Sequence, residues 1–293
     1  MEHGYGYKPE PIFGYHRESA ERAHHALTFG LEVEVENVSG VRVTCGNAEA
    51  TDRVDEVGEG RVYCKHDGSL NDYGFEIVSH PGTLAHHMYV MHWKGILRKA
   101  QKAGRRSHDA RNCGLHVHVG RAEMGETAEE RARVCKMMQI MVSRFRNEWT
   151  VFSRRASSAI NQWAPIPEWY GAQSNDVDEL RAFMDCLSDY SSNHSNRYTA
   201  VNITNRATVE IRIFRGTLKR DTLIAAVQAC ENLTRWCMEH SVEDIPGTTF
   251  ADVVLHTPYR EIVEYMRDRG LLSRDVTTLP GGNRIPDFAT GRA

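Results

Sequence analysis

No apolar run in the sequence approaches the roughly 18 residues that a membrane-spanning helix needs. The first residues also lack the basic end and the apolar stretch of a signal peptide. The seven cysteines are odd in number and form no Cys-x-x-Cys pair, which argues against a disulfide framework and against a cysteine-based zinc site. These absences predict a cytoplasmic protein with reduced thiols and without a membrane partner.

The sequence also lacks a surplus of positive charge. Lysine and arginine together number 36 and aspartate and glutamate 39, which gives a formal net charge of −3. Domains built to grip nucleic acid backbones are usually strongly basic, so we do not expect a nucleic acid partner. With 41% hydrophobic and 26% charged residues over 293 positions, the composition is ordinary for a globular protein and excludes wholesale disorder.

Hydrophobic periodicity divides the chain into strands and helices. Alternation of apolar and polar residues predicts strands at 27–36, 61–65, 74–78, 114–120, 197–204 and 208–214. Apolar periodicity with capping residues predicts helices at 83–103, from Thr127 to about Arg155, and at 176–190, 220–240, 248–255 and 258–269. The segment between the first two strands is expected to hold a return strand at 41–45 and a surface loop, and 157–175 is expected to be an ordered loop.

Long helices without a linker between them favour a single α+β domain with an antiparallel sheet. The expected boundaries are a weakly ordered N-terminal arm at 1–26, the domain at 27–272, and a C-terminal tail at 273–293 that frays.

Polar side chains gather on one face of the predicted strands, because successive residues of a strand point to opposite faces. The polar positions are Glu32, Glu34 and Glu36, then Glu76, then His116 and His118, then Asn202, and finally Glu210 and Arg212. One explanation is an antiparallel sheet with one face in water, where such alternation is routine. A merely solvated face usually mixes lysine, threonine, serine and glutamine, whereas these positions include no lysine.

The same residues suit a site for a metal ion and phosphate. Glu32 and Glu34 are two residues apart on a strand, so their carboxylates lie within about 7 Å of each other. Hard cations such as Mg²⁺ take carboxylate oxygens and keep phosphates as further ligands, and arginine matches phosphate with a planar fork of donors. Taken singly, each strand also fits exposed polar residues, and His116 with His118 also fits a zinc pair.

Four motifs follow one another in the order typical of a known family. They are Phe29-Gly30-Leu31-Glu32-Val33-Glu34; Asp67-Gly68-Ser69-Leu70 with Glu76-Ile77-Val78-Ser79 and Pro81; Cys113-Gly114-Leu115-His116-Val117-His118-Val119-Gly120; and Arg197-Tyr198 with Asn202 and Thr208-Val209-Glu210-Ile211-Arg212. This series resembles the amidoligase family, which belongs to the glutamine synthetase-like superfamily of carboxylate–amine ligases. The resemblance covers roughly residues 29–218 and leaves 1–28 and 240–293 outside it.

The resemblance implies a curved antiparallel sheet backed by helices, a glutamine synthetase-like core, with ATP and Mg²⁺ or Mn²⁺ on its concave face. It implies an ATP-dependent ligase that forms an amide bond, peptide or isopeptide, through an acyl phosphate. The metal ligands that it implies are Glu32, Glu34, Glu76, Glu210 and His116. The residues for ATP phosphates would be His116, His118 and Arg212, and the catalytic residues Arg212, Glu210 and Arg197.

Arg215 and Lys65 are further candidates for contacts with ATP, and Arg154 for a charge contact, because of their positions near these motifs. The aromatic stretch from Trp163 to Tyr170 is a candidate lid that keeps water from the acyl phosphate, although a packed structural loop explains it as well. The substrates are expected to be small-molecule or peptide carboxylates and amines, and a homo-oligomer is possible, since related ligases range from monomers to large rings.

Two other functions use the same residues. His116, His118 and nearby carboxylates would also serve a zinc-dependent hydrolase, although the sequence has no His-Glu-x-x-His helix. The chain would otherwise be a nucleotide- or peptide-binding module that has lost turnover. Formation of an amide and ADP from ATP, a carboxylate and an amine would exclude both.

Overall fold

The computed structural model describes residues 1–16, 26–110, 112–188, 197–286 and 288. The chain divides into two compact units. The first unit comprises Met1–His118 and Phe214–Ile224, and the second comprises Val119–Ile213 and Ala225–Ala293. Strands β6 (Gly114–Gly120) and β8 (Thr208–Arg215) and helix α9 (Arg220–Glu239) contribute residues to both units.

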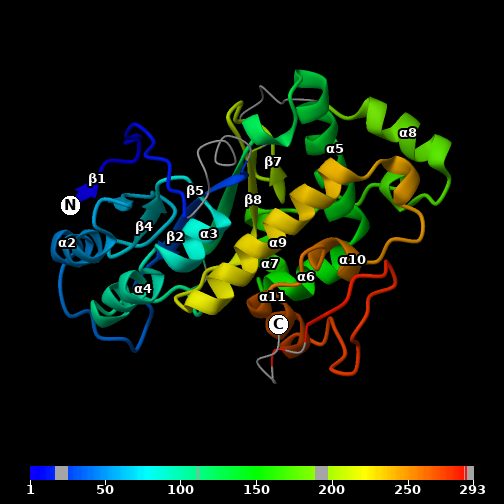
Figure 1. Ribbon diagram of the computed structural model, residues 1–293. Helices are drawn as coiled ribbons and strands as arrows, with labels where there is room; N and C mark the ends of the chain where they lie inside the picture. The colour runs from blue at the N-terminus through cyan, green and yellow to red at the C-terminus, as the bar shows by residue number, and fades with distance from the viewer. Residues whose placement is uncertain (17–25, 111, 189–196, 287, 289–293) are drawn as a thin grey trace. The chain divides into compact units, whose positions relative to one another are not determined.

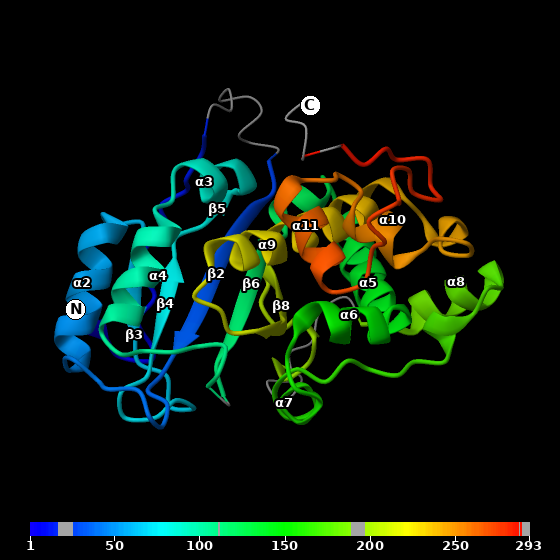
Figure 2. The same cartoon turned by 90° about the horizontal axis from the view of Figure 1, so that it is seen from below.

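The first unit is built on strands that pair mostly antiparallel. Its further elements are β1 (Glu2–His3), β2 (Thr28–Val35), α2 (Asn47–Gly58), β3 (Val62–Lys65), β4 (Phe75–Ser79), β5 (Gly82–Thr83), α3 (Leu84–Tyr89) and α4 (Trp93–Lys102). The strand order is β1-β3-β4-β2-β6, and β5 pairs with the start of β2. Strand β1 pairs in parallel with β3, with Glu2 opposite Cys64. Helices α2 and α4 lie side by side in both views (Figures 1 and 2), and α2 also contacts β3.

The expected strands at 27–36, 61–65, 74–78 and 114–120 are confirmed to within two residues. Their apolar positions are buried, as the alternation requires: Leu31, Val33 and Val35 of β2 are fully buried. In the pairing of β2 with β4, Glu34 stands opposite Glu76 and Glu32 opposite Val78. This register places the two central carboxylates of neighbouring strands next to each other.

The expected return strand and surface loop at 37–60 are wrong. Residues 41–45 form no strand, and helix α2 occupies Asn47–Gly58. Ala50, Thr51 and Val54 form its buried face, at the spacing of one helical stripe. Among the described residues, 41–45 has no strand partner. Its Thr44 N–H donates instead to Ala103 O, 3.3 Å away.

The single helix expected at 83–103 is two helices, α3 and α4. The Thr83 side chain caps α3 by accepting from the His86 N–H, as expected. Gly104 follows α4 with a φ of +82°, the left-handed conformation that favours glycine at a helix end. The chain turns between the helices so that Trp93, at the start of α4, is buried and stacks on His87.

The buried side chain of His87 leads us to expect that the folded protein is less stable at acid pH. His87 is fully buried, and its Nε2 lies 2.7 Å from Phe29 O. Burial lowers the pKa of His87 from 6.5 to about 4, although the bond to Phe29 opposes the shift. His87 accepts a proton more readily in the unfolded chain, so its protonation favours unfolding. Its contribution to the free energy of unfolding should therefore be fully present above pH 6.5 and be lost as the pH falls to about 4. The loss from this residue is about 3 kcal/mol.

The measurement is the free energy of unfolding by urea at pH 7.5 and at pH 4.5 for the wild type and His87→Gln. The variant should lose less stability between the two pH values, whereas the exposed control His92→Gln should behave as the wild type. An equal acid loss in all three proteins would show that His87 does not titrate in this way.

The second unit is mainly helical. Its further elements are η1 (Ala122–Met124), α5 (Ala128–Arg144), α6 (Arg146–Ser153), α7 (Ser157–Trp163), η2 (Gly171–Gln173), α8 (Val177–Cys186), β7 (Val201–Asn202), η4 (Val242–Asp244), α10 (Phe250–Val254) and α11 (Arg260–Asp268). Strand β7 pairs antiparallel with β8, with Asn202 opposite Glu210. Aromatic rings from Phe145 and from helices α6, α10 and α11 pack together within this unit. They belong to Phe145, Trp149, Phe152, Phe250 and Tyr265.

Several boundaries in this unit differ from expectation. The capping box of Thr127 and Glu130 is present, but the helix that it starts ends at Arg144, and α6 follows after Phe145. The expected loop at 157–175 begins with helix α7. The expected strand at 197–204 is only Val201–Asn202. Asp176 caps α8 as expected, and residues 189–190 of that predicted helix lie outside the described residues.

The α+β class with an open, mostly antiparallel sheet and packed helices is confirmed. Parts of the predicted arm (17–25) and tail (287 and 289–293) lie outside the described residues, and the predicted domain limits stay predictions. Of the helices that the structure describes, none has the length and apolarity that crossing a membrane requires.

Candidate functional site

A group of buried carboxylates lies on β2 and β4 of the first unit. Glu34 is 5% exposed and Glu76 3% exposed. Glu34 and Glu76 therefore do not belong to a solvent-exposed face of the sheet, which was the alternative explanation of the alternation. Burial of ionised carboxylates is costly unless they are paired or bind a cation, so the contacts of each group decide what the site does.

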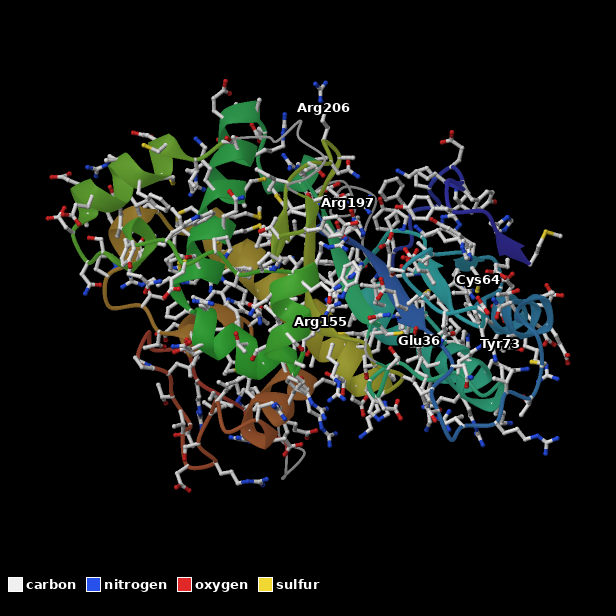
Figure 3. All side chains as sticks on the ribbon, turned by 180° about the vertical axis from the view of Figure 1, so that it is seen from behind. Glu36, Cys64, Tyr73, Arg155, Arg197 and Arg206 are labelled. Carbon is white, nitrogen blue, oxygen red and sulfur yellow. The ribbon has the colours of Figure 1, made fainter. Side chains whose placement is uncertain are left out.

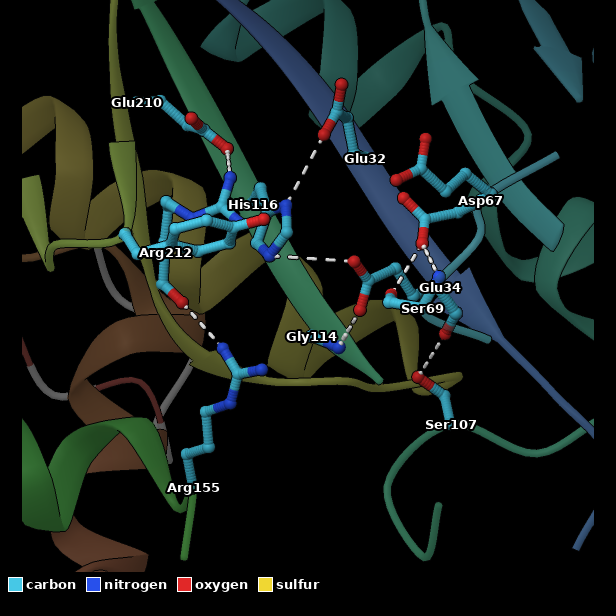
Figure 4. Close-up of polar contacts among 12 residues, drawn as sticks. Glu32, Glu34, Asp67, Ser69, Ser107, Gly114, His116, Arg155, Glu210 and Arg212 are labelled. Atoms are coloured by element: carbon cyan, nitrogen blue, oxygen red, sulfur yellow. Dashed lines mark hydrogen bonds and ion pairs between the residues drawn. The ribbon is translucent and has the colours of Figure 1, made fainter. Parts of the chain in front are cut away.

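Glu34 is held from three sides. Its Oε2 accepts the Gly114 N–H at 2.5 Å, and the Ser107 hydroxyl donates to its backbone carbonyl at 2.7 Å. The His116 imidazole lies between two carboxylates, with Nδ1 3.3 Å from Glu32 Oε2 and Nε2 3.8 Å from Glu34 Oε1 (Figure 4). These contacts fix the Glu34 carboxylate before any ligand binds.

Lys65 and His118 complete the charge pattern around Glu32 and Glu76. Lys65 Nζ lies 2.9 Å from Glu76 Oε2 and 3.5 Å from Glu32 Oε1, and His118 Nε2 lies 3.6 Å from Glu32 Oε1. The structure therefore brings together the predicted ligands Glu32, Glu34, Glu76 and His116 with the two predicted cofactor contacts His118 and Lys65.

These contacts shift the pKa values of two neighbouring carboxyl groups in opposite directions. Burial alone would raise the pKa of Glu32, but the charge of His118, hydrogen bonds from both histidines and Lys65 hold this pKa well below its usual value. Burial and the charge of Glu32 raise the pKa of Glu76 to about 9, and Lys65 only partly offsets this. Without a cation, the carboxyl groups of this site therefore do not all stay ionised.

Asp67 is a member of the site that belongs to one of the four motifs but was given no role from the sequence. Its Oδ1 accepts from the Ser69 N–H at 2.6 Å and from the Ser69 hydroxyl at 2.5 Å (Figure 4). One carboxylate oxygen each from Glu34, Asp67 and Glu76 lies within 4.8 Å of the other two. This spacing and the all-oxygen donor set fit a single Mg²⁺ or Mn²⁺.

The second unit holds a polar group on β7 and β8. Asn202 Nδ2 donates to Glu210 Oε2 at 2.7 Å across the strand pair, and the Arg212 guanidinium forms an ion pair with Glu210 Oε1. Glu210 is buried. The two predicted catalytic residues of β8 are therefore in contact with each other, on the polar face that the alternation of 208–214 predicts.

Arg212 is held in place by two residues to which the sequence gave no role. Arg155 Nη1 donates to the Arg212 backbone carbonyl at 2.9 Å (Figure 4). The Arg212 guanidinium lies 5.8 Å from the Tyr198 ring centre, and that of Arg197 lies 4.7 Å from it. Arg197 also donates to the Tyr198 hydroxyl at 2.6 Å. One tyrosine ring thus holds both predicted catalytic arginines by cation–π contacts.

The remaining candidates are placed as follows. Arg215 ends β8 within the first unit and is half-buried, while Arg154 follows α6 in the second unit with a φ of +59°. The predicted lid is packed on its own unit: Pro167 O accepts from the Ser143 hydroxyl at 2.8 Å, and Pro165 O accepts from the Ala200 N–H at 3.0 Å. The lid hypothesis stays a prediction, because these contacts are those of a packed loop.

Comparison with known proteins identifies the family of the chain. The model of a family described as "Putative amidoligase enzyme" matches residues 45–234. No curated protein matches the chain. Among solved structures, a bifunctional glutathione synthetase from Pasteurella multocida is 10% identical, with a TM-score of 0.41, over 85% of this chain and 45% of that one. A GmaS structure without ligand is 14% identical, with a TM-score of 0.37, over 86% and 64%. The chain spans about half to two thirds of the length of these two.

The matched family is described as one of amidoligase enzymes, and this description gives the class of the protein. The chain belongs to the amidoligase family, whose model covers about two thirds of its length. The resemblance found in the four motifs is thereby confirmed.

Proposed function

We propose that this amidoligase is an ATP-dependent enzyme that forms an amide bond through an acyl phosphate, with Mg²⁺ or Mn²⁺ as cofactor. The observation that carries the proposal is the group formed by Glu34, Asp67 and Glu76, whose oxygens have the spacing of a cation site. The family membership and the arginine pair on Tyr198 support it.

The reaction proposed has two balanced steps. A carboxylate oxygen of the first substrate attacks the γ-phosphorus of ATP, the bond to the bridging oxygen breaks, and ADP leaves. The amine nitrogen of the second substrate then attacks the acyl carbon, inorganic phosphate leaves, and the nitrogen loses a proton. Phosphorylation is needed because a carboxylate is a poor electrophile at neutral pH.

In the first unit we assign Glu32, Glu34, Glu76 and His116 to metal binding, and we add Asp67. When bound at these residues, the cation would offset the negative charge of the phosphates. His116 orients the Glu32 and Glu34 carboxylates, and the Gly114 N–H fixes Glu34. Lys65 and His118 supply positive charge for phosphate oxygens, as Arg215 does at the end of β8.

In the second unit we assign Arg212 to the phosphoryl group in transfer, since its planar fork matches phosphate oxygens. Glu210 orients Arg212 and is a further metal ligand in this proposal, and Arg197 binds phosphate or a substrate carboxylate. The substrates are small-molecule or peptide carboxylates and amines. A cytoplasmic location, a homo-oligomer and the absence of a nucleic acid partner stay predictions.

The first test is thermal unfolding with ATP in the presence and absence of Mg²⁺. A ligand that binds only the folded chain at a hundred times its dissociation constant stabilises it by about 2.7 kcal/mol. We expect ATP to stabilise the protein only when Mg²⁺ is present. Stabilisation by Zn²⁺ alone and none by ATP would instead favour the zinc hydrolase.

Turnover is tested with hydroxylamine in place of the unknown amine. A panel of amino acids and short peptides is incubated with the protein, ATP, Mg²⁺ and hydroxylamine. An acyl phosphate reacts with hydroxylamine to give a hydroxamate and phosphate, so hydroxamate and ADP should form in equal amounts with an accepted carboxylate. Magnesium-dependent ATP binding with no ADP release from any carboxylate would favour the inactive binding module.

A further inference from the structure

A cavity of about 260 Å³ lies within the second unit, lined by residues that the proposed reaction does not use. Three arginines come to it from separate parts of the chain: one follows β6, one lies on α5, and one lies between β7 and β8. The lining comprises Arg121, Ala128, Glu129, Arg131, Ala132 and Arg206. Three positive charges and one negative charge therefore face one cavity.

Arg121 is a buried charge with no carboxylate partner among the residues that the structure describes. It is 8% exposed, and its Nε and Nη2 donate to the backbone carbonyls of Thr208 and Ile203 at 3.2 and 2.8 Å. Its Nη1 has no hydrogen-bond partner among the residues that the structure describes. Backbone carbonyls fix the guanidinium but leave its charge uncompensated, and a buried charge is costly unless an opposite charge pairs with it.

Arg131 lines the same cavity, and part of its guanidinium has no partner among the described residues. It is half-buried, and its Nη1 donates to the backbone carbonyls of Gly125 and Glu126 at 2.9 and 3.0 Å. Its Nη2 and Nε have no partner within the described part of the chain. These two nitrogens form one edge of the guanidinium, the geometry that binds two oxygens of a phosphate or carboxylate at once.

The rim of the cavity sets the sign of its ligand. Arg206 is exposed and extends from the segment between β7 and β8 (Figure 3). Ala128 and Glu129 belong to the first turn of α5, where the helix dipole also favours an anion. Glu129 is exposed, so it opposes an anion only through solvent-screened repulsion.

We propose that this cavity is a binding site for the oxyanion group of a small molecule, a phosphate or a carboxylate. The buried Arg121 and the free edge of Arg131 would bind the oxyanion, and Arg206 would add charge at the rim. The cavity is larger than a single phosphate, which leaves room for the organic part of a phosphate ester or a dicarboxylate. The proposal goes beyond the proposed ligase function, because none of the residues assigned to that reaction lines the cavity.

The test is isothermal titration calorimetry of the full chain at low salt, with inorganic phosphate, glycerol phosphate and malonate as separate titrants. We expect at least one of them to bind. Its affinity should fall about tenfold or more in Arg131→Gln, which removes the free edge. Glu129→Gln should tighten the same ligand severalfold, because it removes the one negative charge of the lining.

Arg181→Gln on α8 is the matched control, since it changes the net charge equally and its side chain pairs with Asp178 and Glu243 instead. It should leave the affinity unchanged. Binding of phosphate titrants alone, or of malonate alone, identifies the source of the oxyanion. If Arg131→Gln does not fold, as circular dichroism would show, the opposite effect of the exposed Glu129→Gln still decides.

No binding of any titrant would overturn the proposal. So would binding that responds equally to Arg131→Gln and Arg181→Gln, since that result indicates general attraction by net charge. Binding lost in Arg212→Gln but kept in Arg131→Gln would assign the anion to the proposed ligase site and would equally overturn it.

Discussion

Glu34→Gln should remove the Mg²⁺-dependent stabilisation by ATP and lower the rate of ADP release about a thousandfold. Glutamine keeps the size of the side chain and an acceptor for the Gly114 N–H, but it removes the charge that a cation needs. A cation and its ligands supply several kcal/mol to a reaction of charged phosphates, and about 4 kcal/mol corresponds to a thousandfold in rate.

The same substitution should not destabilise the protein without ligand. The Glu34 carboxylate lies within 4.8 Å of those of Asp67 and Glu76, so the loss of its charge relieves repulsion. We therefore expect the metal-free variant to unfold at the same or a higher temperature. A gain in stability together with a loss of activity is typical of a functional site.

Glu36→Gln is the matched control, because Glu36 lies two residues further along the same face of the chain and is equally buried. Its Oε2 accepts from the Asn71 N–H at 3.3 Å and it is not part of the carboxylate group. Its replacement should leave the response to ATP and Mg²⁺ intact. An unchanged response in Glu34→Gln, or an equal loss in both variants, would contradict the assignment of Glu34.

Arg212→Gln should lower the rate of ADP release about a thousandfold, while ATP and Mg²⁺ still stabilise the protein. A positioned arginine on a phosphoryl group in transfer contributes a thousandfold or more, and most of this effect arises in the transition state. Arg212→Lys should recover part of the rate, because lysine keeps the charge but not the planar fork.

The rates are measured under single-turnover conditions with a carboxylate that the wild type accepts. Arg146→Gln is the control, since Arg146 is partly exposed and pairs with the exposed Glu168. It should retain the wild-type rate. A full rate in Arg212→Gln, or a loss of ATP binding as large as the loss of rate, would contradict a role confined to the transfer step.

The strands that carry the site were predictable because each has a strict two-residue period. Glu32 and Glu34 of β2 and Glu210 and Arg212 of β8 lie where the alternation places them. The register that sets Glu34 opposite Glu76 was not predictable, since it depends on the length of the connection from β2 through α2 and β3 to β4.

Asp67 and Tyr198 show why other parts of the site were missed. Asp67 lies in one of the four motifs, but Asp-Gly-Ser is also typical of a turn, in which the aspartate side chain hydrogen-bonds the chain two residues on. The residue types alone therefore do not assign Asp67 to the site. Tyr198 contacts two arginines through its ring, and no spacing in the sequence reveals a ring face. Helix α2 was missed because its stripe of small residues, Ala50, Thr51 and Val54, is weakly apolar.

The first unit is assembled from two stretches of chain that are far apart in the sequence. Its last strand segment, Phe214–Arg215, comes almost a hundred residues after His118, and the Gly216 N–H donates to Cys113 O at 3.2 Å. During synthesis, which proceeds at about 5–20 residues per second, residues 1–118 must wait several seconds for these partners. Until then the β6 edge is without residues 214–216, and contacts of such long range form slowly. The nascent chain should therefore be most prone to edge-to-edge association in this interval.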